Sequence, residues 1–282
     1  MKENNGYVYG VGGLKLYYKT WLPDKPPRAV IAIVHGVGEH TGRYQSLADA
    51  LVPAGYIVTG FDQRGHGRSE GKRGHINSWE EYREDMRIYL TEVAKLAPGL
   101  PLFLYGHSMG SLVMPDYLLH YPDGYAGAIL SGTAIDPQDS APAHLVFLAK
   151  VMSGIWPTFS MKVKLDGSFL SRDPKVAAAY NNDPLVHWYR SARWGTEFLN
   201  RIEWLQENFK RITLPVLFLH GECDPVVSVN GARRMHEQIW SKDKTIHIYP
   251  DGLHEPHNDI EHERVGADIK IWVEGRLAVK RG

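Results

Sequence analysis

Short runs of Val, Ile and Leu recur along the chain, and stretches of helical character separate most of them. The runs span residues 29–36, 56–62, 100–106, 126–132, 214–221 and 244–250, and the helical stretches span 44–54, 78–96, 109–120, 230–240 and 259–274. Near-continuous apolar runs that end in Gly or a polar residue are typical of parallel strands buried on both faces. The alternation predicts an α/β fold with a mostly parallel central sheet and helices on both faces.

Two segments depart from this alternation. Gly12 and Gly13 separate two alternating runs near the amino terminus, which predicts an antiparallel hairpin. Residues 136–211 contain no clear strand, and an interval of that length between two strands is typical of an inserted element rather than a loop. We therefore predict a core formed by residues 1–135 and 212–282, interrupted by a helical cap at 136–211.

Apolar residues in the predicted cap recur at helical spacing. They are Leu145, Leu148, Met152, Ile155 and Trp156, with Phe147 and Val151 widening the face. Such a face could receive an apolar substrate, or it could pack on the core. The sequence leaves both interpretations open.

Charge and cysteine content exclude several classes of protein. Lys plus Arg and Asp plus Glu both number 32, so the formal net charge is zero, and no basic excess indicates a nucleic-acid partner. Cys223 is the only cysteine, which rules out an internal disulfide and is compatible with a reducing compartment. The start lacks the apolar segment of a secretory signal, and no apolar run approaches the roughly 18 residues of a membrane span. We expect a soluble, cytoplasmic protein with Cys223 as a buried filler.

Gly106-His107-Ser108-Met109-Gly110 fits the G-x-S-x-G pattern. In that pattern a serine lies on a strained turn between a strand and a helix, and small flanking residues allow a close backbone approach. An apolar run precedes Ser108 and a helical stretch follows it, as the pattern requires. This context predicts that Ser108 is a nucleophile.

A serine hydroxyl needs a base and an acid that orients the base. Asp224 and His254 each follow a predicted strand, in the chain order Ser, Asp, His that this architecture uses. We predict a triad in which His254 takes the Ser108 proton and Asp224 holds His254 in the right tautomer. Asp251 and His257 are the nearest rivals for acid and base, and Asp251 is also explained as a turn residue.

Stabilisation of an oxyanion needs two backbone N–H groups. Met109, directly after the nucleophile, supplies one, and we choose Val37 in the glycine-rich loop 35–40 for the other. His35 in that loop is interpreted as structural. Histidines also cluster at 254–262, but neither segment has the H-E-x-x-H spacing, so we predict no metal site.

Several motifs together resemble the monoacylglycerol lipase / lysophospholipase family of α/β-hydrolases. They are HGVGEHTGRY, FDQRGHGRSEG, GHSMGS, LSRDPKVAAAYNNDPL, DKTIHIYPDGLHEPHND and IKIWV, and the match runs from about residue 15 to 275. Where the family commonly has a glycine, this chain has Ser111, which could alter helix packing near the site. The resemblance implies an α/β-hydrolase fold.

The same resemblance implies an ester hydrolase that acts on lipids with one acyl chain, through an acyl-enzyme and without a cofactor. It assigns Ser108, Asp224 and His254 to the triad and Val37 and Met109 to the oxyanion hole. It also implies a polar pocket for the alcohol, lined by Glu39, Arg43, Tyr180 and His257. For Glu39 and Arg43 the alternative is an ion pair that stabilises the loop.

The resemblance further implies that the cap could contact a membrane peripherally to collect substrate. Two other functions stay open: a carboxylesterase for short-chain or aromatic esters, and a ligand-binding protein that keeps the fold without turnover. Ser108 argues against dehalogenases and epoxide hydrolases, which need an aspartate at that position. Acyl-chain length, head group and oligomeric state are not determined by the sequence.

Overall fold

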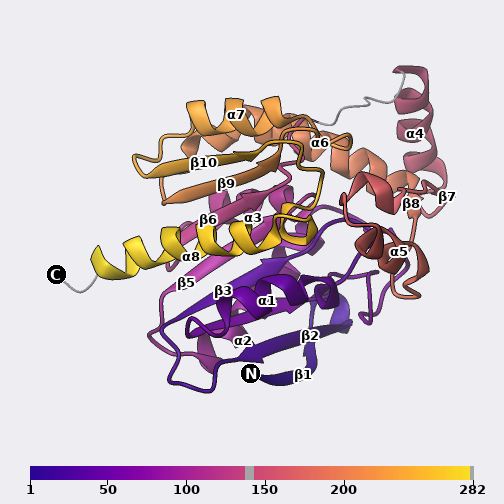
Figure 1. Cartoon of the computed structure of the whole chain (residues 1–282). Helices are drawn as coiled ribbons and strands as arrows, with labels where there is room; N and C mark the ends of the chain where they lie inside the picture. The colour runs from indigo at the N-terminus through magenta and orange to yellow at the C-terminus, as the bar shows by residue number, and fades with distance from the viewer. Residues whose placement is uncertain (137–142, 280–282) are drawn as a thin grey trace.

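The computed structural model describes residues 1–136 and 143–279, and a central sheet runs through these residues (Figure 1). The strands of the sheet are β1 (Lys2–Tyr9), β2 (Lys15–Leu22), β3 (Ala29–Val34), β4 (Tyr56–Phe61), β5 (Leu102–His107), β6 (Gly127–Ser131), β9 (Val216–Gly221) and β10 (Lys244–Tyr249). Their spatial order is β1-β2-β4-β3-β5-β6-β9-β10. The hairpin of β1 and β2 is antiparallel, and β2 pairs antiparallel with β4. From β4 onward all neighbours are parallel, so the predicted α/β fold is confirmed.

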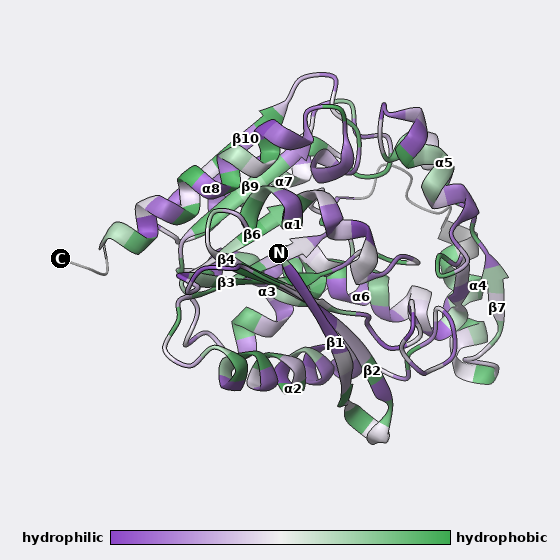
Figure 2. Cartoon of the chain, turned by 60° about the horizontal axis from the view of Figure 1, so that its bottom comes forward, coloured by the Kyte–Doolittle hydropathy of each residue, from purple (hydrophilic) through white to green (hydrophobic). Residues whose placement is uncertain are grey.

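Helices cover both faces of this sheet. They are α1 (Gln45–Leu51), α2 (Glu80–Leu96), α3 (Gly110–His120), α7 (Val229–Gln238) and α8 (His262–Val279). Figure 2 shows α1 and α8 on one side of the sheet and α2 on the other. Among the helices described, none combines the length and the apolar composition needed to cross a bilayer.

The alternating side chains of the parallel strands separate two apolar cores. Val30 and Ala32 of β3 belong to the core beneath α2, α3 and α7, whereas Ile31 and Ile33 belong to the core beneath α1 and α8. Successive residues of a strand point to opposite faces, so a strand that is apolar throughout can fill both cores. This explains why the strand runs lack an alternating polar pattern.

The segment between β6 and β9 contributes no strand to the central sheet within its described part, residues 143–211. It contains α4 (Ala143–Ile155), β7 (Ser160–Lys162), the 3₁₀ helix η3 (Gly167–Phe169), α5 (Pro174–Asn182), β8 (Tyr189–Ser191), α6 (Ala192–Asn208) and the 3₁₀ helix η4 (Phe209–Arg211). The expectation of a strand-free segment needs one correction, because β7 and β8 pair with each other as a separate antiparallel ribbon. In Figure 1, α4, α5, β7 and β8 gather at one end of the sheet.

Ion pairs fasten this segment to the core. Arg201 of α6 pairs with Asp116 of α3 at 2.5 Å, and Asp116 is fully buried. Asp183 pairs with His40 at 2.9 Å. Both attachments join residues far apart in the sequence, so the segment is held against the core from two sides.

The apolar face predicted in this segment is exposed to solvent. Phe147 and Ile155 of α4 have exposed fractions of 70% and 78%, and Leu148, Val151 and Trp156 are exposed as well. The alternative that this face packs on the core is therefore wrong for these side chains. The side chain of Leu145 lies outside the described residues.

Cys223 also differs from its expected position. The structure places it on the surface rather than in the interior. Its backbone N–H donates to the carbonyl of Gly252 at 3.0 Å, which holds the residue in the loop after β9. The expectation of a buried filler was wrong because a short side chain in a connecting loop follows the path of the backbone, not its own hydropathy.

Adjacent residues of α8 provide a test of the two-core packing. Trp272 has an exposed fraction of 4% and contacts Phe103 edge to face, whereas Ile271 is 71% exposed. We expect Trp272→Ala to lower the free energy of unfolding by about 3–5 kcal/mol because it leaves a cavity. Ile271→Ala should change it by less than about 0.5 kcal/mol. Denaturant unfolding measures both, and equal effects would contradict the assigned faces.

Candidate active site

Ser108 lies between β5, which ends at His107, and α3, which begins at Gly110. Its φ angle is 51°, a left-handed conformation that is uncommon for a residue with a side chain. Its N–H donates to the carbonyl of Ser131 at 3.0 Å, which ties the turn to β6. The serine is thus held in a strained turn by neighbouring strands, at the carboxyl edge of the sheet.

The two glycines of the motif are required by space. A Cβ on Gly110 would overlap the carbonyl oxygen of Val34 on β3, and a Cβ on Gly106 would lie 2.6 Å from the carbonyl oxygen of Gly110. Both obstacles are backbone atoms, which cannot move aside as a flexible side chain can. The flanking glycines therefore let the turn pack directly on β3.

The hydroxyl of Ser111 adds a second support to this turn. It donates to the carbonyl of Ser108 at 2.6 Å and accepts the N–H of Ala134 at 2.9 Å. The sequence indicated that Ser111 departs from the usual glycine but not that its hydroxyl would bridge two segments. Such a bond depends on where the loop after β6 runs, and the sequence carries no signal for that.

His254 and Asp224 are in direct contact. The Nδ1 of His254 lies 2.8 Å from Asp224 Oδ2, and both residues are buried. The other carboxylate oxygen of Asp224 accepts the N–H groups of Val226 and Val227 at 2.8 and 3.1 Å. These bonds fix the carboxylate so that it orients the His254 ring with Nε2 as the nitrogen left for a reaction.

His220 is a further partner of Asp224 that sequence analysis missed. Its Nε2 lies 3.2 Å from Asp224 Oδ2, and its Nδ1 accepts the N–H of Thr133 at 3.3 Å. An imidazole that accepts at Nδ1 carries its proton on Nε2, so it donates toward the carboxylate. His220 stands at the end of β9, four residues before Asp224, and that spacing was the available signal.

The pKa shifts of the pair fit a base with an anionic partner. Burial alone lowers the pKa of His254, but the charge and the hydrogen bond of Asp224 more than offset it, and the net shift is upward. Burial raises the pKa of Asp224, yet His254 and His220 outweigh it and hold that pKa well below its usual range. Asp224 is therefore charged at neutral pH and stabilises a protonated His254.

The rivals for the acid and base roles occupy other positions. Asp251 is exposed, with a φ angle of 57°, as suits a turn residue. His257 is fully buried, stacks on Tyr44 with ring centroids 4.7 Å apart, and lies 3.1 Å from the Tyr105 hydroxyl through Nδ1. Burial and the neighbouring His107 lower the pKa of His257 to about 3. Its Nε2 is buried and makes no hydrogen bond among the described residues, and its role toward a substrate stays a prediction.

The loop that follows β3 approaches the serine closely. A Cβ on Gly36 would lie 3.1 Å from Ser108 Cβ. The Gly36 N–H donates to Glu39 Oε1 at 2.6 Å, and His35 accepts the Gln63 N–H at 2.9 Å, so the loop is braced at its start. Among the hydrogen bonds of the described residues, neither Val37 nor Met109 donates its backbone N–H. Both groups are therefore available to an oxyanion.

Glu39 and Arg43 form an ion pair, with Arg43 Nη1 2.8 Å from Glu39 Oε2. The second oxygen of Glu39 accepts the Tyr44 hydroxyl at 2.8 Å besides the loop N–H. Arg43 also binds Glu255 with two hydrogen bonds of 2.5 and 2.8 Å. Burial lowers the pKa of Arg43, but the two carboxylates raise it by more than burial lowers it, so the guanidinium stays charged. This arrangement favours the loop-stabilising alternative for Glu39.

Glu255 was missed by sequence analysis, although it directly follows His254. It is buried, and Arg43 more than offsets the effect of burial and holds the pKa of Glu255 well below its usual range. Charged residues are almost never fully buried without a partner. An acidic residue directly after a predicted base was therefore a signal that a cationic partner lies nearby.

Tyr180 reaches the same group of charges from the cap segment. The Arg43 guanidinium lies 4.7 Å from the centre of its ring. Burial raises the pKa of Tyr180 to about 12, so the hydroxyl keeps its proton. Among the described residues that hydroxyl makes no hydrogen bond, and its predicted role toward a substrate stays a prediction.

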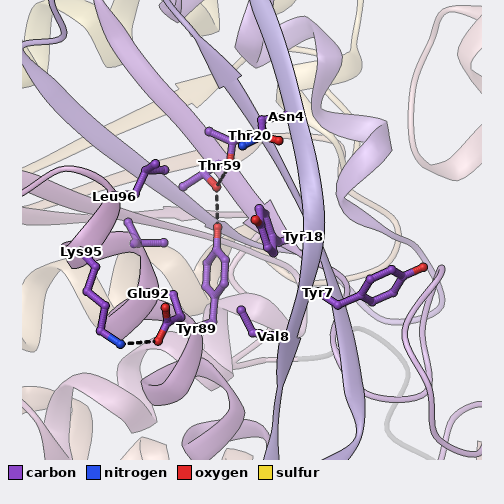
Figure 3. A pocket seen from close by; sticks show the side chains of 11 residues that line it. Asn4, Tyr7, Val8, Tyr18, Thr20, Thr59, Tyr89, Glu92, Lys95 and Leu96 are labelled. Atoms are coloured by element: carbon purple, nitrogen blue, oxygen red, sulfur yellow. Dashed lines mark hydrogen bonds and ion pairs between the residues drawn. The ribbon is translucent and has the colours of Figure 1, made fainter.

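A separate cavity of about 320 Å³ lies between the β1–β2 hairpin and α2 (Figure 3). At its base the hydroxyls of Thr20, Thr59 and Tyr89 form a chain with bonds of 2.7 and 2.6 Å. None of its lining residues belongs to the group around Ser108. Among the residues that the structure describes, no three His, Cys, Asp or Glu side chains are grouped so as to hold a metal ion.

Comparison with known proteins places this site in context. The family model described as serine aminopeptidase, S33 matches residues 25–261. A monoacylglycerol lipase of Mycolicibacterium smegmatis is 36% identical over 95% of this chain and 96% of its own length. The human monoglyceride lipase is 32% identical over 96% of this chain and 91% of its own. The crystal structure of a Paleococcus ferrophilus monoacylglycerol lipase matches 93% of this chain and 98% of its own, with 37% identity and a TM-score of 0.82.

Substitution at Gly110 tests the packing that holds Ser108. In Gly110→Ala the new Cβ overlaps the Val34 carbonyl, so we expect the turn to shift and labelling of Ser108 by a fluorophosphonate probe to slow by about tenfold or more. Gly195→Ala is the matched control, because a Cβ there meets nothing within 4 Å. The control should label normally and gain up to about 1 kcal/mol of stability in α6. Normal labelling of Gly110→Ala would refute the steric argument.

Proposed function

Because the chain belongs to the family described as serine aminopeptidase, S33, and has the α/β-hydrolase fold, we propose that it hydrolyses monoacylglycerols or related single-chain lipid esters. The products are a fatty acid and an alcohol. The observation that carries the proposal is the His254–Asp224 pair at the sheet edge where Ser108 occupies its strained turn. The names of the relatives support the ester substrate.

In the proposed acylation step, Ser108 Oγ attacks the ester carbonyl while His254 Nε2 takes the hydroxyl proton. The carbonyl oxygen becomes an oxyanion, and the N–H groups of Val37 and Met109 donate to it. Asp224 stabilises the positive charge that forms on His254. The intermediate collapses when His254 returns the proton to the alcohol oxygen, which leaves the acyl group on Ser108.

Deacylation uses the same groups. A water molecule gives its proton to His254 as it attacks the acyl carbonyl, and the oxyanion forms again between Val37 and Met109. Collapse releases the fatty acid and returns the proton to Ser108 Oγ. The proposed cycle needs no cofactor, since every proton is carried by His254.

Residues 136–211 act in this proposal as a cap over the acyl chain, and a polar group at its edge receives the alcohol. Arg43 and the Tyr180 hydroxyl would bind the alcohol, and His257 would line the same end. The oxygens of Glu39 are already bonded to Gly36, Arg43 and Tyr44, so we assign Glu39 to bracing the loop that carries Val37.

The exposed apolar residues of α4 support a peripheral contact between the cap and a membrane. Phe147, Leu148, Ile155 and Trp156 leave apolar surface in water, which is favourable to bury in a lipid interface. A substrate with one long acyl chain resides in such an interface. We therefore propose that α4 faces the lipid from which the substrate is taken.

Substrate comparison tests the function. Each methylene of the acyl chain that is buried under the proposed cap contributes up to about 0.8 kcal/mol of binding free energy. We therefore expect kcat/KM to rise with acyl length until the space under the cap is filled. Because triacylglycerols carry two further chains, monoacylglycerol should be hydrolysed roughly tenfold faster or more when both are dispersed alike. Ser108→Ala is the blank, with an expected loss of about 10⁴–10⁶-fold in kcat.

Three results would redirect the assignment. A preference for acetate over medium-chain esters would indicate a short-chain carboxylesterase. Hydrolysis of aminoacyl p-nitroanilides in preference to esters would indicate a peptidase, as the family description names. Absence of turnover together with absence of fluorophosphonate labelling would indicate a ligand-binding protein.

The pH dependence tests His254 as the base. Only the neutral imidazole can take the Ser108 proton, so kcat/KM should fall as the pH drops below the pKa of His254. Asp224 raises that pKa, so the midpoint is expected above 6.5, the ordinary value for histidine. Initial rates between pH 5 and pH 9 measure it, and a profile that is flat or that falls with rising pH would exclude this role.

A further inference from the structure

Arg190, on β8 of the cap segment, has no carboxylate partner among the described residues. Its Nη1 donates to the carbonyl of its neighbour Tyr189 at 2.7 Å, and its guanidinium lies 5.2 Å from the Trp194 ring centre. The residue as a whole is half-buried. A guanidinium has five N–H donors, and a single hydrogen bond among the described residues leaves most of them unused.

The backbone on both sides of Arg190 is fixed to the core. The N–H of His187 donates to the carbonyl of Gly38 at 2.8 Å, and the N–H of Ser191 donates to the carbonyl of Gly74 at 2.9 Å. A Cβ on Gly38 would lie 3.3 Å from Arg190 Nη2. The guanidinium is therefore held against the loop that carries Val37. Gly38 in this loop is two residues from Gly36, the residue that approaches Ser108.

No carboxylate of the described residues pairs with the charge of Arg190. Burial lowers its pKa to about 10, and the groups that favour its charged form are the hydroxyls of Tyr180 and Tyr82. The pKa of His187 falls to about 3 through burial and through the charges of Arg190 and Arg73, so this imidazole stays neutral. Arg43, in contrast, binds two carboxylates. An incompletely paired cation at neutral pH thus remains beside Tyr180.

We propose that Arg190 is an anion subsite for a phosphate carried by the alcohol of the substrate. The Arg190 guanidinium interacts electrostatically with Tyr180. The Tyr180 ring centre lies 4.7 Å from the Arg43 guanidinium, and these two residues are the ones proposed above to bind the alcohol. A guanidinium fork matches two oxygens of a phosphate, and such charge-assisted bonds are strong where water is scarce. The preferred class is then single-chain acyl esters of glycerol phosphate, an inference that rests on the proposed function.

The test compares 1-lauroylglycerol with 1-lauroylglycerol 3-phosphate on wild type and on Arg190→Gln. We expect Arg190→Gln to raise KM for the phosphate ester by about tenfold or more and to change kcat/KM for the neutral ester by less than about twofold. Arg190→Lys keeps the charge without the fork and should recover part of the loss. Arg211→Gln removes an exposed cation elsewhere and should leave both substrates unchanged.

A binding measurement separates this subsite from the hydrolase activity. Glycerol 3-phosphate and inorganic phosphate are titrated calorimetrically into Ser108→Ala, with and without Arg190→Gln. Weaker binding of glycerol 3-phosphate in the double variant supports the subsite even if no ester is hydrolysed. Equal weakening for inorganic phosphate would identify the ligand as free phosphate and overturn the substrate assignment.

Two kinetic outcomes would also overturn the proposal. Equal losses on neutral and phosphate esters in Arg190→Gln would mean that the guanidinium only braces the loop at Gly38. Unchanged KM for the phosphate ester, with weaker inhibition by laurate, would mean that Arg190 binds the carboxylate of the product instead.

Discussion

One buried guanidinium, that of Arg43, connects three segments that are distant in the sequence. It binds Glu39 in the loop after β3, Glu255 beside His254, and the ring of Tyr180 in the cap segment. Glu39 in turn holds the Gly36 N–H. Removing one partner of a buried ion pair lowers the free energy of unfolding by about 3–5 kcal/mol, because the remaining charge stays buried without a partner. A single positive charge therefore links the loop after β3, the segment that carries His254, and α5.

The polar residues around Arg43 differ in how much of their hydrogen-bonding capacity is already used by the protein. A residue whose hydrogen-bonding capacity is used up by protein groups positions other residues, as Glu39 does. Tyr180 and Arg190 have unused hydrogen-bonding capacity among the described residues, which is why we propose them as ligand-binding residues. Counting occupied donors and acceptors separates the two roles in a cluster where residue type alone does not.

The sequence was sufficient for the features that are local or that follow from chain order. The apolar strand runs predicted that helices cover both faces of the sheet, because a strand buried on both sides must be apolar throughout. The positions of Ser108, Asp224 and His254 after strands predicted a triad, and the structure brings Asp224 and His254 into contact; the catalytic roles stay a prediction. Glu255 and the bridging hydroxyl of Ser111 were missed because their partners, Arg43 and the Ala134 N–H, come from distant segments of the chain. His220 was missed although its partner Asp224 is only four residues away, since the spacing alone does not show that the side chains meet. The ribbon was missed because β7 and β8, which pair with each other, are short and far apart in the sequence. The exposure of Cys223 was missed because it depends on the path of the loop after β9.

Main-chain hydrogen bonds contribute to the attachment of residues 143–211 near the site. The backbone N–H groups of His187 and Ser191 bond to core carbonyls, and the N–H of Glu255 bonds to the carbonyl of Leu170. Such bonds form whatever side chain the residue carries. Mutations at these positions can therefore alter the lining of the pocket while the backbone framework stays in register. The backbone of these residues can thus stay fixed for the chemistry while selection varies their side chains to accommodate new substrates.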